Sequence, residues 1–268
     1  MLPLPASRLP LLGMLLGSVL LTPPETGTPR LPPPGQPISA QEFFQAAPAG
    51  YDFYFTRAVY GTGLARGFRR YASWATDFPK ADEQFVIVID RTLELLDVYQ
   101  GVNPVRLDDP ELRRFPFLYM LEVGYMSLSD EEVRGLRDYL LSGGFLVVDD
   151  FWGTAEWNNF EYEMRRVFPE LPIVELGTDH QLFNTFYDIE EIKQVPAANN
   201  LYRRYERDGI VPHIRGIHDD KGRLMMVINW NSDLGDAWEW SERPEYPFDL
   251  SSYAYKLAVN FIIYSLTH

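Results

Sequence analysis

A strand–helix–strand unit over residues 117–148 constrains the fold more than any other part of the sequence. Phe117–Leu121 and Phe145–Val148 are apolar runs of buried-strand length. Between them, Ser129-Asp130-Glu131-Glu132 has the pattern of a capping box that begins a helix, and Gly143-Gly144 permits its end. Short connections of this kind are typical of a right-handed parallel crossover. We therefore expect one α/β domain, residues 45–268, with a mainly parallel sheet.

Apolar patterns bounded by turn residues predict the other elements. The run Phe85–Ile89 has the residue types of a buried strand, but the helix-start signal Asp77-Phe78-Pro79 before it favours a helix. The remaining strands are expected at Tyr51–Tyr60, Leu95–Tyr99 and Ile173–Leu176, with a hairpin of Ile214–Ile217 and Leu224–Ile228. The remaining helices are expected at Leu64–Trp74, Glu156–Val167 and Tyr253–Leu266, the last capped by Ser251.

The N-terminal region differs from the rest of the chain. Residues 1–48 hold 11 of the 21 prolines and carry no net charge. The apolar run Leu9–Leu21 follows Arg8 and has the length of a signal-peptide core, too short for a transmembrane helix. We expect residues 1–22 to be a signal peptide or an N-terminal anchor and residues 23–44 a proline-rich linker. The predicted location is periplasmic or extracellular, or alternatively anchored to the membrane by residues 9–21.

Charge and cysteine content exclude several classes of partner and chemistry. The net charge of −14 repels nucleic acid phosphates and anionic lipids. We therefore expect no nucleic acid partner, and membrane contact only through the N-terminal segment. The absence of cysteine excludes a thiolate nucleophile, cysteine-ligated zinc and disulfides.

Several segments together resemble a bacterial family known as domain of unknown function 4159. They are Trp74–Asp82 (WATDFPKAD), Phe115–Gly124 (FPFLYMLEVG), Leu136–Gly153 (LRDYLLSGGFLVVDDFWG), Arg166–Pro172 (RVFPELP), Asn229–Glu239 (NWNSDLGDAWE) and Lys256–Thr267 (KLAVNFIIYSLT). The resemblance covers roughly residues 51–268. It implies a doubly wound, flavodoxin-like sheet with helices on both faces, similar to the class I glutamine amidotransferase group, with the C-terminal hairpin added.

What the resemblance implies about function is limited. Family members look like exported or membrane-anchored proteins, and some relatives carry this domain behind a membrane-attached von Willebrand A-like region. The family brings no established activity, so no catalytic residue is carried over. The chain has neither a cysteine nor a G-x-S-x-G motif, which excludes amidotransferase and thiol-protease chemistry.

Two carboxylates follow the predicted central strand Phe145–Val148. Asp149 and Asp150 would lie at the carboxyl end of that strand, where open α/β sheets bind ligands. They can bind a metal or provide a general base, or one of them can simply cap the next turn. Trp152 places an indole close to them.

Three further residues are candidates for the site. His180 suits a proton shuttle or a ligand, or a loop histidine bonded to backbone. Asn231 and Asp233 follow the strand Leu224–Ile228 near several indoles, which suits a carbohydrate, although Asn and Asp also make ordinary turns. Because no zinc-site histidine spacing or calcium-loop pattern occurs, we predict no metal site and no cofactor.

Three functions follow from these observations. The favoured one is a non-catalytic binding domain of the cell envelope with a carbohydrate-like ligand. One alternative is a cysteine-free hydrolase that uses Asp149 or Asp150 with His180. The other is a protein-interaction module of an envelope assembly. Whether the chain is an enzyme stays open at this point. For Arg57 we expect a buried carboxylate partner, or alternatively a clamp for an anionic ligand.

Overall fold

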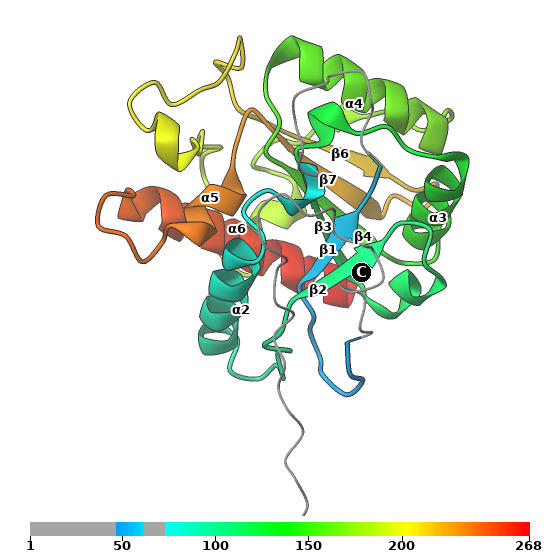
Figure 1. Cartoon of the computed structure of the whole chain (residues 1–268), viewed down its shortest axis with the longest axis horizontal. Coiled ribbons are helices and arrows are strands. Elements are labelled where there is room, and N and C mark those ends of the chain that lie inside the picture. The colour runs from blue at the N-terminus through cyan, green and yellow to red at the C-terminus, as the bar shows by residue number, and fades with distance from the viewer. Residues whose placement is uncertain (1–46, 62–72) are drawn as a thin grey trace, which may run out of the picture. The chain divides into compact units, whose positions relative to one another are not determined.

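A seven-stranded sheet in the order β2-β1-β3-β4-β7-β6-β5 organises the computed structural model, which describes residues 47–61 and 73–268 (Figure 1). The strands are β1 (Thr56–Val59), β2 (Asn103–Arg106), β3 (Phe117–Leu121), β4 (Phe145–Asp149), β5 (Val174–Glu175), β6 (His213–His218) and β7 (Leu224–Trp230). The first five in spatial order run parallel, whereas β6 is antiparallel to β7 and β5 is antiparallel to β6.

The parallel strands follow the doubly wound order. Taken along the chain, β1, β2, β3, β4 and β7 occupy the spatial order 2-1-3-4-5, so the winding direction reverses between β1 and β3. The expected pairing of residues 117–121 with 145–149 is confirmed, with Phe117 opposite Phe145 and Leu121 opposite Asp149. The predicted α/β class with a mainly parallel sheet is therefore confirmed, and the carboxyl ends near β1 and β3 are the usual ligand edge.

Helices cover both faces of this sheet (Figure 1). The helices are α2 (Lys80–Thr92), α3 (Asp130–Leu141), α4 (Gly153–Val167), α5 (Leu234–Glu239) and α6 (Phe248–Thr267). Because successive strand residues face opposite sides, Tyr119 packs in the core with α2, α5 and α6. Its neighbours Leu118 and Met120 pack in the second core with α3 and α4.

The capping box that begins α3 forms as predicted. Ser129 Oγ accepts a hydrogen bond from the Glu132 backbone N–H at 3.1 Å, and the Glu132 carboxylate accepts one from the Ser129 backbone N–H at 2.8 Å. The same carboxylate accepts a bond from the Gly61 backbone N–H at 2.8 Å. One acidic side chain thus fixes both the start of a helix and the chain that leaves β1.

Some elements differ from the predictions. Residues 95–99 form only a bridge between Val98 and Phe53, and the second strand is Asn103–Arg106 instead. That strand contains Pro104 and lies at the sheet edge, which is where proline is tolerated in a sheet. The last helix begins at Phe248, after Pro247, so Ser251 lies inside it and does not cap it. The ambiguous run Phe85–Ile89 lies within α2 and is helical, as favoured.

Several expectations concern the chain outside the described residues. The signal peptide or anchor, the linker and most of the helix expected at Leu64–Trp74 fall there. Of that helix, only Ser73 and Trp74 are described, and they lie in the short 3-10 helix Ser73–Ala75. All described residues belong to one compact unit. Within the part of the chain that the structure describes, no helix combines the length and apolarity needed to cross a membrane.

Candidate functional site

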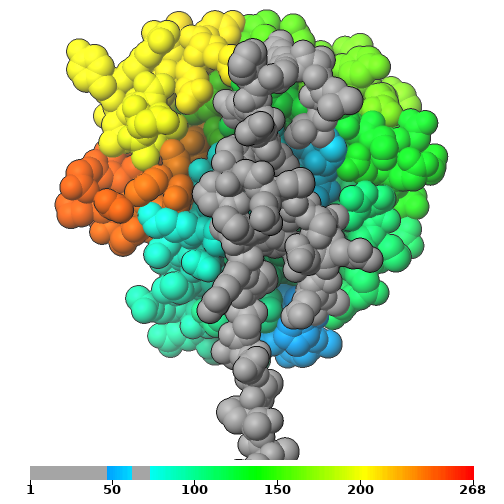
Figure 2. All heavy atoms as spheres, viewed as in Figure 1, coloured from blue at the N-terminus to red at the C-terminus, as the bar shows by residue number. Residues whose placement is uncertain are grey.

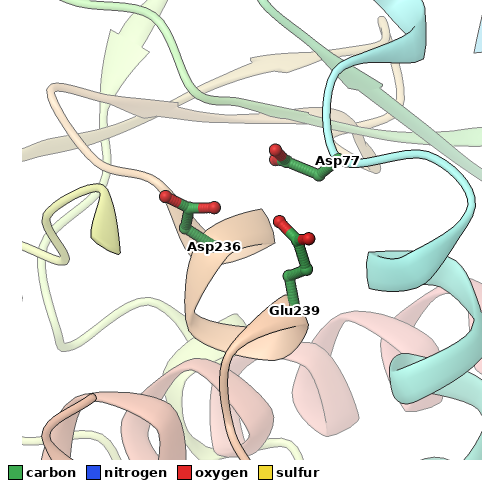
Figure 3. Close-up of side chains that lie close together, drawn as sticks. All are labelled: Asp77, Asp236 and Glu239. Atoms are coloured by element: carbon green, nitrogen blue, oxygen red, sulfur yellow. The ribbon is translucent and has the colours of Figure 1, made fainter. Parts of the chain in front are cut away.

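Acidic side chains from several segments meet at the carboxyl edge of the parallel strands. Two groups have carboxylate oxygens within 4.8 Å of one another: Asp77 with Asp236 and Glu239, and Asp77 with Asp150 and Asp233. We call these five residues the carboxylate cluster. Figure 3 shows Asp77 extending from the segment before α2 toward Asp236 and Glu239 on α5. The cluster therefore joins the turns that follow β4 and β7 to the chain that precedes α2.

Tight turns bring these residues together. Asp77, Asp150 and Asn231 have positive φ angles of 60°, 46° and 63°, which residues other than glycine rarely adopt. Such backbone conformations persist only where the surrounding structure holds them. The Asp150 backbone N–H donates to the Ser232 carbonyl at 3.1 Å, and the Asn231 N–H donates to the Phe151 carbonyl at 3.0 Å. The turns after β4 and β7 are thus bonded to each other.

Asp149 anchors α5 to the sheet beside the cluster. Its Oδ2 accepts hydrogen bonds from the Tyr119 hydroxyl at 2.8 Å and from the backbone N–H groups of Leu234 and Gly235 at 2.8 and 3.0 Å. Its Oδ1 is shielded from solvent and has no hydrogen-bond partner among the described residues. Burial raises the pKa of Asp149 to about 7.

Hydrogen bonds orient the carboxylates of the cluster. Asp236 Oδ2 accepts from the Ala198 backbone N–H at 2.6 Å, and its Oδ1 accepts from the Trp240 indole at 3.1 Å. Asp233 Oδ1 caps α5 by accepting from the Asp236 N–H at 2.8 Å. The segment near residue 198, yellow in Figure 2, lies beside the orange surface of residues that follow α5. The Trp240 indole, which follows α5, and the backbone of the segment near residue 198 therefore hold the Asp236 carboxylate in place.

Asp77 differs from its neighbours in the cluster. Its Oδ2 is shielded from solvent and finds no hydrogen-bond partner within residues 47–61 and 73–268. A Cβ on Gly235 would lie 3.2 Å from this Asp77 oxygen and 3.5 Å from Asp233 Oδ1. A side chain at position 235 would thus crowd the cluster, and glycine leaves that space open.

The proximity of these carboxylates disfavours their charged forms. Burial is the largest cause that raises the pKa of Asp77, Asp150 and Asp233 well above their usual range, and neighbouring carboxylates raise each of them further. The pKa of Glu239 rises to about 7 through burial and the nearby Asp236. Arg57 lowers the pKa of Asp77 but is itself bound elsewhere. The cluster therefore requires protons or a cation.

The arrangement suits a hard divalent cation. Every donor in the cluster is a carboxylate oxygen, which is the ligand type that Ca²⁺ and Mg²⁺ prefer. Calcium–oxygen distances are about 2.3–2.6 Å, so oxygens that share one ion lie within about 5 Å of each other. Asp77 and Glu239 are only partly buried, which gives the cluster a side that faces solvent.

Two predicted site residues, Trp152 and Asn231, stabilise the turns through hydrogen bonds and are buried there. Trp152 is only 2% exposed, and its indole N–H donates to Asp150 Oδ1 at 3.0 Å. Asn231 Oδ1 accepts from the Gly153 N–H at 2.8 Å, and its Nδ2 donates to the Val211 carbonyl at 2.7 Å. The structure thus places Asp149, Asp150, Trp152, Asn231 and Asp233 at one edge. Trp152 presents no stacking face there, and Asn231 has both ends of its amide engaged.

His180 lies at the opposite edge of the sheet. Its Nδ1 accepts from the Leu182 N–H at 3.2 Å, and its Nε2 lies 3.4 Å from Nε2 of His218. His218 ends β6, which runs antiparallel to β7, so this end meets the amino ends of the parallel strands. The expectation that His180 would join Asp149 and Asp150 in one site is therefore not met, because the hairpin reverses the chain direction.

Sequence reasoning missed three residues of the cluster. Asp236 and Glu239 are three residues apart on α5 and so share one helix face, a spacing that would have been a usable signal. The local pattern around Asp77 indicates a helix start and gives no signal for a site, because only the fold brings Asp77 to the other carboxylates. The pairing expected for Arg57 is confirmed: its Nε donates to both oxygens of Asp82 at 2.9 and 3.1 Å, and both side chains are buried.

A separate cavity of about 610 Å³ lies away from the cluster, against α4 and β6. Its lining includes Trp157, Phe168, Arg215 and Ile217. Arg215 is engaged there, because it pairs with Glu175 at 2.7 Å and lies over the Trp157 and Trp230 rings. This cavity shares none of the five carboxylates.

Comparison with known proteins places the chain in a family. No curated protein matches it. Residues 56–266 match the family model described as Domain of unknown function (DUF4159). The match extends from the first residue of β1 nearly to the end of α6 and includes every residue of the carboxylate cluster. The chain therefore belongs to the DUF4159 family.

Proposed function

We propose that this protein is a binding domain whose carboxylate cluster holds a divalent metal cation at the carboxyl edge of the sheet. One observation carries the proposal. Oxygens of Asp77, Asp150 and Asp233 lie within 4.8 Å of one another, and Asp77 Oδ2 is shielded from solvent with no hydrogen-bond partner in the described chain. An unpartnered buried carboxylate oxygen is costly unless a proton or a cation neutralises it.

The donor set favours a metal over an organic cation. An ammonium group brings one positive charge and contacts carboxylate oxygens at about 2.7–2.9 Å. A divalent ion brings two charges and contacts them at shorter distances, which suits several converging carboxylates better. Arg57, which lies near Asp77, is bound to Asp82 and to the Trp74 and Thr76 carbonyls. Lys80, which lowers the pKa of Glu239, pairs with Glu242 at 3.1 Å. Because neither of these described cations pairs directly with a cluster carboxylate, the neutralising role is left to protons or to a bound cation.

A bound cation would also provide the contact to a further ligand. Calcium takes six to eight oxygen ligands, more than the carboxylates of one group supply through single oxygens. Open coordination positions accept hydroxyl oxygens, so a carbohydrate or another polyhydroxyl molecule is the ligand that we propose. The hydrolase alternative with His180 gains no support, because His180 lies at the other edge of the sheet.

We further propose that the protein is exported to the cell envelope. Arg8 followed by the apolar run Leu9–Leu21 and the proline-rich segment supports export. Fractionation of cells that express the full chain tests this: we expect it in the periplasm, the medium or the membrane. Recovery of the full-length protein from the cytoplasm would refute export without bearing on cation binding.

Thermal unfolding of the full-length protein after treatment with EDTA tests the cation proposal. We expect Ca²⁺, Mg²⁺ or Mn²⁺ to raise the melting temperature in a concentration-dependent way, since a ligand at a hundred times its Kd adds about 2.7 kcal/mol of stability. Comparison of Ca²⁺ with Mg²⁺ identifies the preferred ion. The variant Asp77→Asn should lose most of the shift, because Asp77 belongs to both carboxylate groups, and Asp220→Asn, an exposed acid of the β6–β7 turn, should keep it. An unchanged melting temperature of the parent with all three ions would overturn the proposal.

A further inference from the structure

We infer that the carboxylate cluster binds two divalent cations and that Asp77 bridges them. This inference rests on the proposed function and adds the number of ions and the role of one residue. Its basis is that the cluster consists of two groups, each with three carboxylate oxygens within 4.8 Å. Asp77 is the one residue that belongs to both groups.

The two positions are built by different segments. Asp150 and Asp233 complete the first position from the turns that follow β4 and β7. Asp236 and Glu239 complete the second from one face of α5, with Asp77 opposite them (Figure 3). A substitution in one segment can therefore disturb one position and leave the other nearly intact.

Asp77 has the properties that a bridging ligand needs. A carboxylate has two oxygens and can bind two cations that lie about 3.5–4 Å apart, as in two-metal sites. Asp77 Oδ2 accepts no hydrogen bond from the described residues, so no internal donor competes for it. By contrast, both oxygens of Asp236 already accept hydrogen bonds, which orient that residue as a terminal ligand.

Charge balance also favours two ions. One divalent cation would neutralise fewer than half of the five carboxylates, and buried like charges at this distance repel strongly. Two divalent cations would leave one net negative charge on the five carboxylates, beside the Lys80 ammonium that lowers the pKa of Glu239 and pairs with Glu242. Binding of the first ion through Asp77 also orients the carboxylate for the second, so the affinities of the two positions are linked.

Titration of the full-length protein with Mn²⁺ tests this inference. Isothermal calorimetry should give two ions per chain for the parent and for the control Asp220→Asn. The isosteric variants Asp150→Asn and Glu239→Gln should each retain one ion. Asp77→Asn should weaken both positions at least tenfold, and circular dichroism verifies that each variant is folded.

Electron paramagnetic resonance of the parent tests the bridge without any variant. Two Mn²⁺ ions that share a carboxylate are exchange-coupled, so the six-line signal of isolated Mn²⁺ should be lost at saturation and should return in Glu239→Gln. One ion in the parent, unaffected by Glu239→Gln, would overturn the two-ion inference and leave the proposed function standing. Two uncoupled ions would overturn the bridge. No binding at all would refute both proposals.

Discussion

The hydroxyl of Tyr119 on β3 donates a 2.8 Å hydrogen bond to Asp149 Oδ2 on the neighbouring strand β4. The same oxygen accepts the backbone N–H groups of Leu234 and Gly235 at the start of α5. One carboxylate oxygen thus joins two central strands to the short helix that carries Asp236 and Glu239. The position of two of the five residues of the carboxylate cluster depends on this contact.

Replacement of Asp149 should therefore destabilise the protein in a graded way. Asp149→Ala leaves three buried donors without a partner, and we expect a loss of about 2–4 kcal/mol in the free energy of unfolding. Asp149→Asn keeps an acceptor oxygen of the same size and should cost much less. Urea denaturation measures both variants. Equal losses in the two would show that the acceptor oxygen is not what stabilises this contact.

The buried pair Arg57–Asp82 should behave as a unit. Asp82→Ala leaves the Arg57 guanidinium buried without its carboxylate, and we expect a loss of about 3–5 kcal/mol. The double variant Arg57→Leu with Asp82→Leu should lose less stability than the sum of the losses in the single variants Arg57→Leu and Asp82→Leu, because no charge is left unpaired. A double-mutant cycle by chemical denaturation measures this coupling. Additive losses would contradict it.

Stability should fall with rising pH when divalent cations are absent. The pKa of Asp149 is about 7 in the folded protein, against 3.8 ordinarily. Between these values the folded state binds more protons at Asp149 than the unfolded state, so the contribution of Asp149 to the free energy of unfolding decreases from about pH 4 to about pH 7 and then levels off. Asp149→Asn should reduce this decrease by about 2–4 kcal/mol, and Asp220→Asn should not. Urea titrations at several pH values test this, and an unchanged decrease in Asp149→Asn would refute it.

Close packing at Gly135 should make a small substitution costly. A Cβ at this position of α3 would lie 1.9 Å from the Leu107 carbonyl oxygen, which belongs to the backbone. Gly135→Ala should therefore destabilise the fold by about 1–3 kcal/mol, although alanine has the higher helix propensity. Arg134→Ala, on the exposed side of the same helix, should stay within about 0.5 kcal/mol. Stabilisation by Gly135→Ala would contradict the packing.

The central part of the fold could be predicted because local signals and long-range pairing agree there. The capping box at Ser129 and the apolar runs at Phe117–Leu121 and Phe145–Val148 each specify one element, and their short connections specify parallel pairing. By contrast, the edge strand Asn103–Arg106 has no apolar run of its own and contains a proline. Its pairing with β1, and not its composition, makes it a strand.

The candidate site could be predicted only in part. Asp149, Asp150 and Asp233 lie near the ends of strands whose direction the sequence indicates, so their common edge was foreseeable. Asp77 reaches that edge from a segment whose path depends on tertiary packing. His180 was misplaced because its position depends on β6, whose antiparallel direction carries His218 to the other edge.

Anomalous diffraction from crystals grown with Mn²⁺ tests the central claim most directly. The claim is that divalent cations bind at the carboxyl edge of the sheet through Asp77 and its neighbours. The account predicts an anomalous peak between Asp77, Asp150 and Asp233, with a second peak between Asp77, Asp236 and Glu239. Crystals that contain Mn²⁺ but give no peak within bonding distance of Asp77, with its Oδ2 still unpartnered, would contradict it.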